Sequence, residues 1–133
     1  MHEPGLDGNS HLRVLVVDAD ERVCESLAGL LSIGDQVEVV GTAGDPGSAV
    51  AIIDAARPDV VMVDPRLPEL DRGIAFIEHL RLTEPAIRIV VMNWSDILED
   101  RLLRCEADGF VRKTFRPSEL LAAVRAAGAS VAN

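Results

Sequence analysis

The sequence is poor in the residues that cross-link small proteins or bind transition metals. It has two cysteines, Cys24 and Cys105, without a CxxC spacing, and three scattered histidines, His2, His11 and His79. Disulfide frameworks and zinc sites depend on regularly spaced cysteines and histidines. We therefore expect neither kind of site, and we expect both cysteines to behave as small buried hydrophobic residues.

Long apolar runs and an excess of basic residues are also missing. No run reaches the roughly 18 apolar residues that a membrane span needs, and the polar start of the chain lacks the features of a signal peptide. Its 13 basic residues are outnumbered by 22 acidic ones, which gives a net charge of −9. Such a charge repels nucleic-acid backbones and anionic membranes. We expect a cytoplasmic protein that neither binds nucleic acid directly nor inserts into a membrane.

The 133 residues are enough for one folded domain. Hydrophobic residues make up 48% of the chain and charged residues 26%, which is typical of globular proteins and unlike disordered ones. We expect a flexible tail over residues 1–10, a single domain over residues 11–128 and a C-terminal tail over residues 129–133.

Short apolar runs alternate five times with longer amphipathic stretches. The predicted strands are residues 12–17, 37–40, 59–63, 87–92 and 109–111. The predicted helices are residues 21–33, 46–57, 74–82, a segment from residue 95 or 96 to about 106, and residues 117–127. This alternation predicts an α/β fold, a doubly wound five-stranded parallel sheet with helices on both faces. The order of the strands in space does not follow from the alternation.

Glycine, proline and capping residues indicate where these elements begin and end. Asp45 before Pro46 is typical of a helix start, and Pro58 ends the same helix. Gly41 is predicted to end the second strand, and Gly73 belongs to a loop that precedes the third helix.

Polar residues stand at the ends of the predicted strands, where open parallel sheets form their binding sites. They are Asp18 and then Asp20 after the first strand, Asp64 after the third, Asn93 after the fourth and Lys113 after the fifth. Carboxylates gathered at one edge favour Mg²⁺, and a nearby ammonium group would bind an anion. Each residue also has a plainer interpretation, because aspartates cap helices and open turns and a lysine can simply be solvated.

Three segments of the sequence stand out as a set. They are VLVVDAD (residues 14–20), PDVVMVDPRLP (residues 58–68), and ADGFVRK followed by PSELLAAVRA (residues 107–126). Together they resemble the receiver domain of two-component response regulators, in the CheY-like superfamily, in order and in separation. In that family the first segment is the acidic-pair strand, the second surrounds the phosphoacceptor aspartate, and the third carries a functional lysine. The resemblance implies the strand order 2-1-3-4-5, which brings the ends of the first and third strands together.

The resemblance also implies a role for each polar residue. Asp64 would accept a phosphoryl group from a sensor histidine kinase, a phosphotransfer protein or a small phosphodonor. Mg²⁺ would be held by Asp18, Asp64 and the main-chain carbonyl of Arg66, with Asp20 as a further candidate ligand. Lys113 would contact the phosphoryl oxygens. Because an aspartate and a phosphate dianion repel each other, Mg²⁺ and the lysine would offset that repulsion.

Some positions depart from the family's pattern. Ala19 replaces the second acid, which should weaken Mg²⁺ binding because affinity for hard cations depends on carboxylate count. Asn93 replaces a Ser or Thr that contacts the phosphoryl group; its amide can still donate a hydrogen bond, and Ser95 is a substitute if the register shifts. Phe110 occupies the family's aromatic switch position, although packing in the core is its plainer interpretation. Trp94 is expected to pack in the structure, or else to lie at the crevice or on a partner-binding surface.

The leading hypothesis is a stand-alone receiver, monomeric or weakly dimeric. It would be phosphorylated on Asp64 and would signal through protein–protein contacts, without being an enzyme for an external substrate. We expect the partner-binding face to lie near Trp94, Leu98, Arg101 and Phe110.

Two alternatives stay open. The first is a pseudo-receiver that keeps the fold as a binding module and ignores phosphate; Ala19 and Asn93 favour it, and Asp64 and Lys113 oppose it. The second is a phosphatase that uses the DxD motif at residues 18–20, with Asp18 as nucleophile. The Gly-Thr pair that often follows that motif is missing, and the chain is short for that fold.

Overall fold

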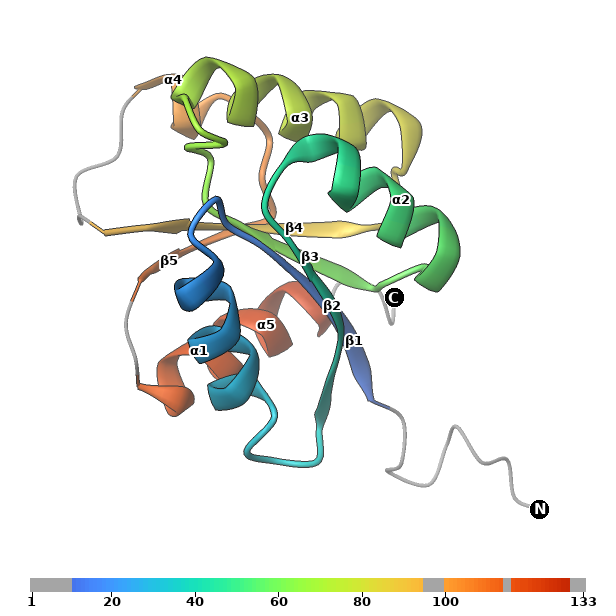
Figure 1. Ribbon diagram of the computed structural model, residues 1–133, viewed down its shortest axis with the longest axis vertical. Helices are drawn as coiled ribbons and strands as arrows, with labels where there is room; N and C mark the ends of the chain where they lie inside the picture. The colour runs from blue at the N-terminus through green and yellow to red at the C-terminus, as the bar shows by residue number, and fades with distance from the viewer. Residues whose placement is uncertain (1–10, 95–99, 114–115, 130–133) are drawn as a thin grey trace.

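Strands and helices alternate throughout the protein, which is described by a computed structural model over residues 11–94, 100–113 and 116–129 (Figure 1). The elements are β1 (Leu12–Val17), α1 (Glu21–Leu31), β2 (Val37–Ala43), α2 (Pro46–Ala56), β3 (Val60–Val63), α3 (Leu70–Thr83), β4 (Arg88–Asn93), α4 (Asp100–Leu103), β5 (Gly109–Arg112) and α5 (Pro117–Ala129). All strand pairs are parallel, and the order across the sheet is β2-β1-β3-β4-β5. The predicted fold class and the strand order implied by the resemblance are both confirmed.

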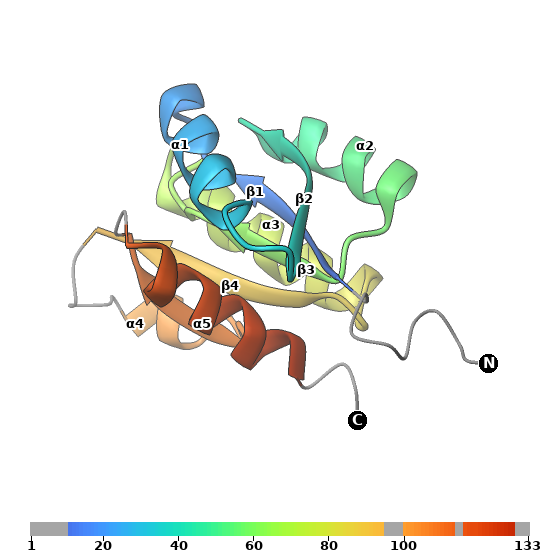
Figure 2. The ribbon, with the colours of Figure 1, turned by 90° about the horizontal axis from the view of Figure 1, so that it is seen from below.

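The sheet is covered on both faces, which explains why its strands read as continuous apolar runs. Helices α1 and α5 lie on one face and α2, α3 and α4 on the other; in Figure 2, α1 and α5 lie in front of the sheet and α3 behind it. Successive residues of β1 alternate between the two cores, with Val14 and Val16 facing α1 and α5 and with Leu15 and Val17 facing α2 and α3.

The predicted limits of the second helix are confirmed to within one residue. The Asp45 side chain accepts a hydrogen bond from the Ser48 backbone N–H at 2.8 Å, and Pro46 occupies the first turn. The hydrogen bonds from the backbone and side chain of Ser48 lower the pKa of the Asp45 carboxyl. At the other end, Arg57 takes a left-handed conformation with φ of 50°, directly before Pro58.

The prediction that Gly41 ends the second strand is wrong. The strand β2 continues to Ala43, and its register against β1 shifts, so that Val14 pairs with Val39 and Leu15 with Gly41. A Cβ atom at Gly41 would lie 3.2 Å from the side chain of Ile52 on α2. The glycine therefore marks a bulge and a close approach of helix to strand, which is a common use of glycine inside strands.

Gly73 was predicted to lie in a loop, and this is also wrong, because α3 begins at Leu70 and includes it. A Cβ atom at this position would lie 1.5 Å from the carbonyl oxygen of Pro65. The glycine thus allows the loop after β3 to pass directly against the helix. The cost of placing glycine inside a helix is small compared with that of such a clash.

The remaining boundaries differ by a few residues. Helix α1 ends at Leu31, two residues early, and α5 continues to Ala129. Helix α4 ends at Leu103 rather than near residue 106, and Glu106 beyond it has a left-handed φ of 62°. The predicted caps of that helix, Ser95 and Asp96, lie outside the described residues.

Both cysteines are buried, as expected. Cys24 and Cys105 are each 2% exposed, and burial raises the pKa of both thiols. The Cys24 thiol donates a hydrogen bond to the carbonyl of Asp18 at 3.3 Å. Among the residues that the structure describes, no helix is long and apolar enough to cross a membrane.

Candidate functional site

Four polar side chains are buried in the described part of the chain, and all of them lie at the C-terminal ends of strands. They are Asp18 after β1, Asp64 after β3, Asn93 at the end of β4 and Lys113 after β5, each less than 9% exposed. Burying a charged group is costly unless it is paired. The buried polar side chains of this otherwise apolar core therefore lie at the edge of the sheet where parallel sheets form their binding sites.

Lys113 joins the two carboxylates. Its Nζ lies 2.5 Å from Oδ2 of Asp18 and 2.7 Å from Oδ2 of Asp64, and its side chain is only 3% exposed. Burial by itself would lower the pKa of Lys113, but the hydrogen bonds to Asp18 and Asp64 outweigh it and raise that pKa above its ordinary value. The lysine is therefore a fixed positive charge between two buried negative ones.

The residue type at position 113 is a signal that the sequence analysis missed. Lys113 is the only lysine in the sequence, in which arginine supplies every other strongly basic side chain. A compact ammonium group fits between two carboxylates in a buried space, whereas a planar guanidinium group needs more room. The single lysine thus lies between two buried carboxylates, where a compact ammonium group fits.

The two aspartates are held in the same way. Oδ1 of Asp18 accepts a hydrogen bond from the backbone N–H of Asp20, and Oδ1 of Asp64 accepts one from Arg66, both at 2.9 Å. Their own backbone N–H groups donate to Ala43 and Val17 on neighbouring strands, also at 2.9 Å. Each carboxylate therefore uses one oxygen to fix its own loop and points the other at Lys113.

The oxygen atoms at this edge suit a hard divalent cation. Oδ2 of Asp18 is buried, and it forms an ion pair with the Lys113 ammonium at 2.5 Å. Such an oxygen beside a second carboxylate, with the Arg66 main chain in the same loop, is the kind of donor set that Mg²⁺ prefers. In the described ranges, no group of three or more carboxylate, histidine or cysteine side chains gathers to hold a metal. The residues fit Mg²⁺ with few charged ligands.

Asp20 has a structural role of its own. It is the N-cap of α1, and its Oδ1 accepts hydrogen bonds from the backbone N–H groups of Arg22 at 2.9 Å and Val23 at 3.4 Å. Its side chain is exposed. The plainer of the two interpretations, a helix cap, thus describes the observed geometry, while metal binding by Asp20 stays a prediction.

Two substitutions separate capping from metal binding at this position. We expect Asp20→Ala to lower the free energy of unfolding by about 1 kcal/mol, and Asp20→Asn, which keeps a capping oxygen, to leave it nearly unchanged. If Asp20 only caps the helix, calorimetric titration of Asp20→Asn with Mg²⁺ should give a dissociation constant within about twofold of that of the original protein. A tenfold weaker affinity in Asp20→Asn would instead make Asp20 a ligand, by about 1.4 kcal/mol.

Asn93 lies beside the loop that follows β3. Its Oδ1 is 3.5 Å from Nη1 of Arg66, and its carbonyl accepts a hydrogen bond from the backbone N–H of Lys113 at 2.5 Å. Asn93 is 8% exposed, and it lies at the same edge of the sheet as Asp64. The suggested substitute, Ser95, lies outside the described residues.

Phe110 and Trp94 are more exposed than their plainer interpretation, packing in the structure, would imply. Phe110 is 38% exposed rather than buried in the core. It pairs with Val91 on the face that α4 covers, and β5 is an edge strand of the sheet. Trp94 is 57% exposed, and its ring centre lies 4.7 Å from Nζ of Lys113, so it stands at the crevice.

Of the predicted partner-binding face, Arg101 forms an ion pair with Asp71 of α3. Leu98 lies outside the described residues.

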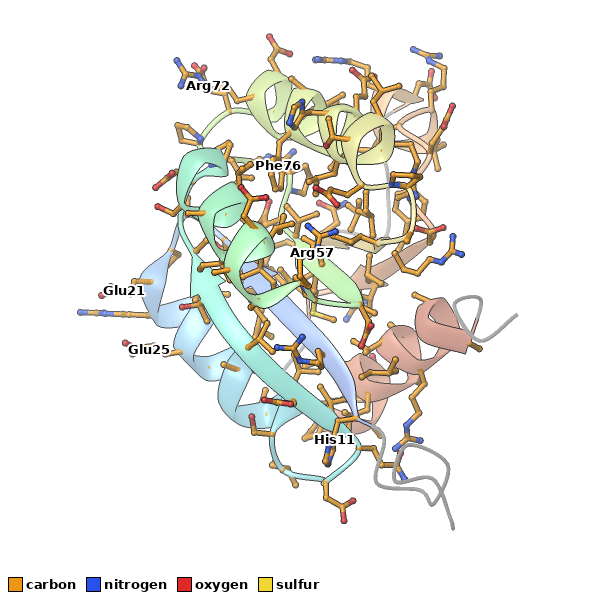
Figure 3. The ribbon with its side chains drawn as sticks, turned by 90° about the vertical axis from the view of Figure 1, so that its right-hand side faces the viewer. His11, Glu21, Glu25, Arg57, Arg72 and Phe76 are labelled. Atoms are coloured by element: carbon orange, nitrogen blue, oxygen red, sulfur yellow. The ribbon has the colours of Figure 1, made fainter. Side chains whose placement is uncertain are left out.

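Hollows in the described part of the molecule differ in how close they lie to the buried polar residues. A groove of about 440 Å³ lies between α2 and α3, with Phe76 facing α2 and Arg72 near the start of α3 in Figure 3, and it contains none of the four buried polar residues. A cavity of about 260 Å³ lies beside Asp18 and is lined by Ala19, Glu21, Cys24, Thr42, Ala43 and Gly44. The smaller cavity therefore adjoins Asp18, while the larger groove adjoins none of the four buried polar residues.

Comparison with known families and curated proteins gives consistent matches over most of the chain. The family described as "Response regulator receiver domain" matches residues 14–125. Response regulator MprA of Mycolicibacterium vanbaalenii is 39% identical over 118 residues, which is 86% of this chain and 49% of that protein. The DNA-binding transcriptional activator DevR/DosR of Mycobacterium tuberculosis is 35% identical over 121 residues, or 89% of this chain and 55% of that protein. The chain thus spans about half the length of these relatives.

Solved structures show the same fold. A two-component response regulator of the LuxR family from an Aurantimonas species is 29% identical and has a TM-score of 0.79, covering 91% of this chain and 87% of that one. The response regulator domain of Thermotoga maritima CheB is 26% identical, with a TM-score of 0.77, covering 90% of this chain and 97% of that one.

Proposed function

Because this chain belongs to the response regulator receiver domain family of two-component systems, we propose that it accepts a phosphoryl group on Asp64. Phosphorylation of an aspartate is typical of that family. The observation that carries the assignment is the buried Lys113 ammonium, shared by Asp18 and Asp64 at the carboxyl edge of the sheet. Such an ammonium can remain beside Asp64 after phosphorylation and offset the negative charge of the bound phosphoryl group.

The proposed chemistry is an in-line transfer. A carboxylate oxygen of Asp64 forms a bond to phosphorus while the donor's P–N bond (phosphohistidine) or P–O bond (acyl phosphate) breaks, and the electron pair leaves with the donor. Lys113 donates hydrogen bonds to the phosphoryl oxygens, and the Asn93 amide donates another. Mg²⁺, when held by Asp18, Asp64 and the Arg66 carbonyl, supplies further positive charge against the repulsion between carboxylate and phosphate.

The proposed partners follow from this chemistry. The phosphoryl group comes from a sensor histidine kinase or a phosphotransfer protein, and the output is a protein–protein contact on the face that includes Trp94 and Phe110. The chain is then a phosphoacceptor and not an enzyme for an external substrate, and it acts in the cytoplasm as a monomer or weak dimer. DNA binding belongs to the relative named for it and is not proposed here.

Intact-mass measurement tests the phosphoacceptor. We expect one phosphoryl adduct after incubation with Mg²⁺ and acetyl phosphate, and none on Asp64→Asn, because the amide is not a nucleophile. Ala19→Asp, which restores a second acid beside Asp18 at an exposed position, should form the adduct at a lower Mg²⁺ concentration.

The outcomes separate the proposed function from its alternatives. An adduct that persists on Asp64→Asn and disappears on Asp18→Asn would contradict the assignment and favour the phosphatase chemistry of the DxD motif. No adduct on the original chain, on Ala19→Asp, or with phosphorylated kinases as donors would leave a pseudo-receiver that uses the fold as a binding module. An adduct on Ala19→Asp alone would mean that the native site is inactive because it lacks the second acid.

A further inference from the structure

The only tryptophan and the only lysine of the chain are in contact. The Trp94 ring centre lies 4.7 Å from Nζ of Lys113, within the range of a cation–π interaction. The two residues differ sharply in exposure, with Trp94 57% exposed and the Lys113 side chain only 3% exposed. More than half of the Trp94 surface is therefore accessible to solvent while its ring contacts the buried ammonium.

The indole completes the surroundings of that ammonium. Two carboxylate oxygens lie within 2.7 Å of Nζ, and the face of the ring offers a third region of negative potential. Trp94 directly follows Asn93, whose carbonyl accepts the hydrogen bond from the Lys113 backbone N–H. The ring and the lysine are thus anchored to the same pair of neighbouring strands, β4 and β5.

A ring that lies over the ammonium also keeps water away from it. Removal of water from around Lys113 also strengthens its attraction to Asp18 and Asp64, since charges interact more strongly at low dielectric constant.

We propose that Trp94 is a positioning residue that covers the Lys113 ammonium and holds it against the Asp18 and Asp64 carboxylates. The effect of Trp94 on phosphorylation rests on the proposed function, because phosphoryl transfer to Asp64 requires a well-placed Lys113. The shielding of the Lys113 ammonium by Trp94 can be measured without any phosphoryl transfer.

Chemical modification of the lysine measures the cover directly. Lys113 carries the only side-chain amine of the chain, so an amine-selective acylating reagent followed by peptide mass analysis reports on it alone. Trp94→Leu keeps an apolar side chain but no ring. We expect Lys113 in this variant to react about two- to fivefold faster than in the original protein, which corresponds to the loss of a cation–π contact at a partly exposed site. Trp94→Phe keeps an aromatic face and should fall between them.

Leu103→Ala is the matched control. Leu103 on α4 is 56% exposed, nearly the same as Trp94, and its truncation also removes an exposed apolar side chain. We expect it to leave the modification rate of Lys113 unchanged. Thermal unfolding of all four proteins establishes that the rates are compared in folded chains.

The second readout is the rate of adduct formation with acetyl phosphate. Positioning by the ring predicts a rate that falls about two- to fivefold in Trp94→Leu and largely recovers in Trp94→Phe. A Lys113 modification rate in Trp94→Leu equal to that of the original protein would overturn the proposal, and so would equal acceleration in Leu103→Ala. If none of these proteins, nor Ala19→Asp, forms an adduct with acetyl phosphate or with phosphorylated kinases as donors, while lysine modification responds as expected, the proposed function fails and the shielding of Lys113 by Trp94 stands.

Discussion

Replacement of Gly73 by alanine should destabilise the protein by more than about 3 kcal/mol, beyond the usual cost of adding a methyl group to a packed core. The new Cβ atom would lie 1.5 Å from the Pro65 carbonyl oxygen and 2.2 Å from its carbon. Both are backbone atoms, so no change of side-chain rotamer relieves the clash. The loop or the first turn of α3 must move instead.

That movement should also disturb the site. Pro65 stands between Asp64 and Arg66, whose backbone N–H holds Oδ1 of Asp64. We therefore expect Gly73→Ala to reduce phosphoryl adduct formation even at temperatures where the variant is folded. Urea unfolding monitored by circular dichroism measures the stability, and the adduct assay measures the effect on the site.

Gly29→Ala is the matched control, with the opposite sign. Gly29 is exposed within α1, and a Cβ atom there would have nothing within 4 Å. Alanine should stabilise the protein by about 0.5–1 kcal/mol, because it favours the helix and restricts the unfolded chain. Equal effects of the two substitutions would contradict the close approach at Gly73.

The contrast between these glycines shows what sequence could and could not predict about the fold. Apolar runs and polar strand ends are local patterns, and they were enough for the parallel sheet and for the placement of Asp18, Asp64 and Lys113. A glycine is ambiguous, because it serves equally in turns, bulges and close contacts. Only the position of the neighbouring backbone shows that Gly41 belongs to a bulge and Gly73 to a contact.

The site shows the same limit. Residue type and strand position predicted which polar side chains would gather, because strand ends on one edge must converge. They left open whether Asp20 would cap α1 or bind a metal, and whether Trp94 would pack in the structure or lie at the crevice. These depend on side-chain direction after the strand has ended, where the alternation of a strand no longer constrains it.

Lys113→Met should cost about 3–5 kcal/mol of stability at neutral pH, the range found when one partner of a buried ion pair is removed. Methionine has a similar length and is easily packed, so the loss reports on charge rather than on volume. Without the ammonium, two buried carboxylates face each other with no cation between them. Arg125→Met, which removes an exposed positive charge from α5, should stay within about 0.5 kcal/mol of the original protein.

A second substitution or added Mg²⁺ should each recover part of the stability that Lys113→Met loses. Asp18→Asn in the Lys113→Met background removes one of the two facing charges, so the double variant should be more stable than Lys113→Met alone, with a coupling energy above about 1 kcal/mol in the double-mutant cycle. Mg²⁺ should stabilise Lys113→Met by mass action, because it binds the folded carboxylates and not the unfolded chain. If Lys113→Met unfolds at the same urea concentration as the original protein, the ammonium is not what makes the burial of Asp18 and Asp64 tolerable. The assignment of Lys113 as the fixed charge of the site would then be wrong.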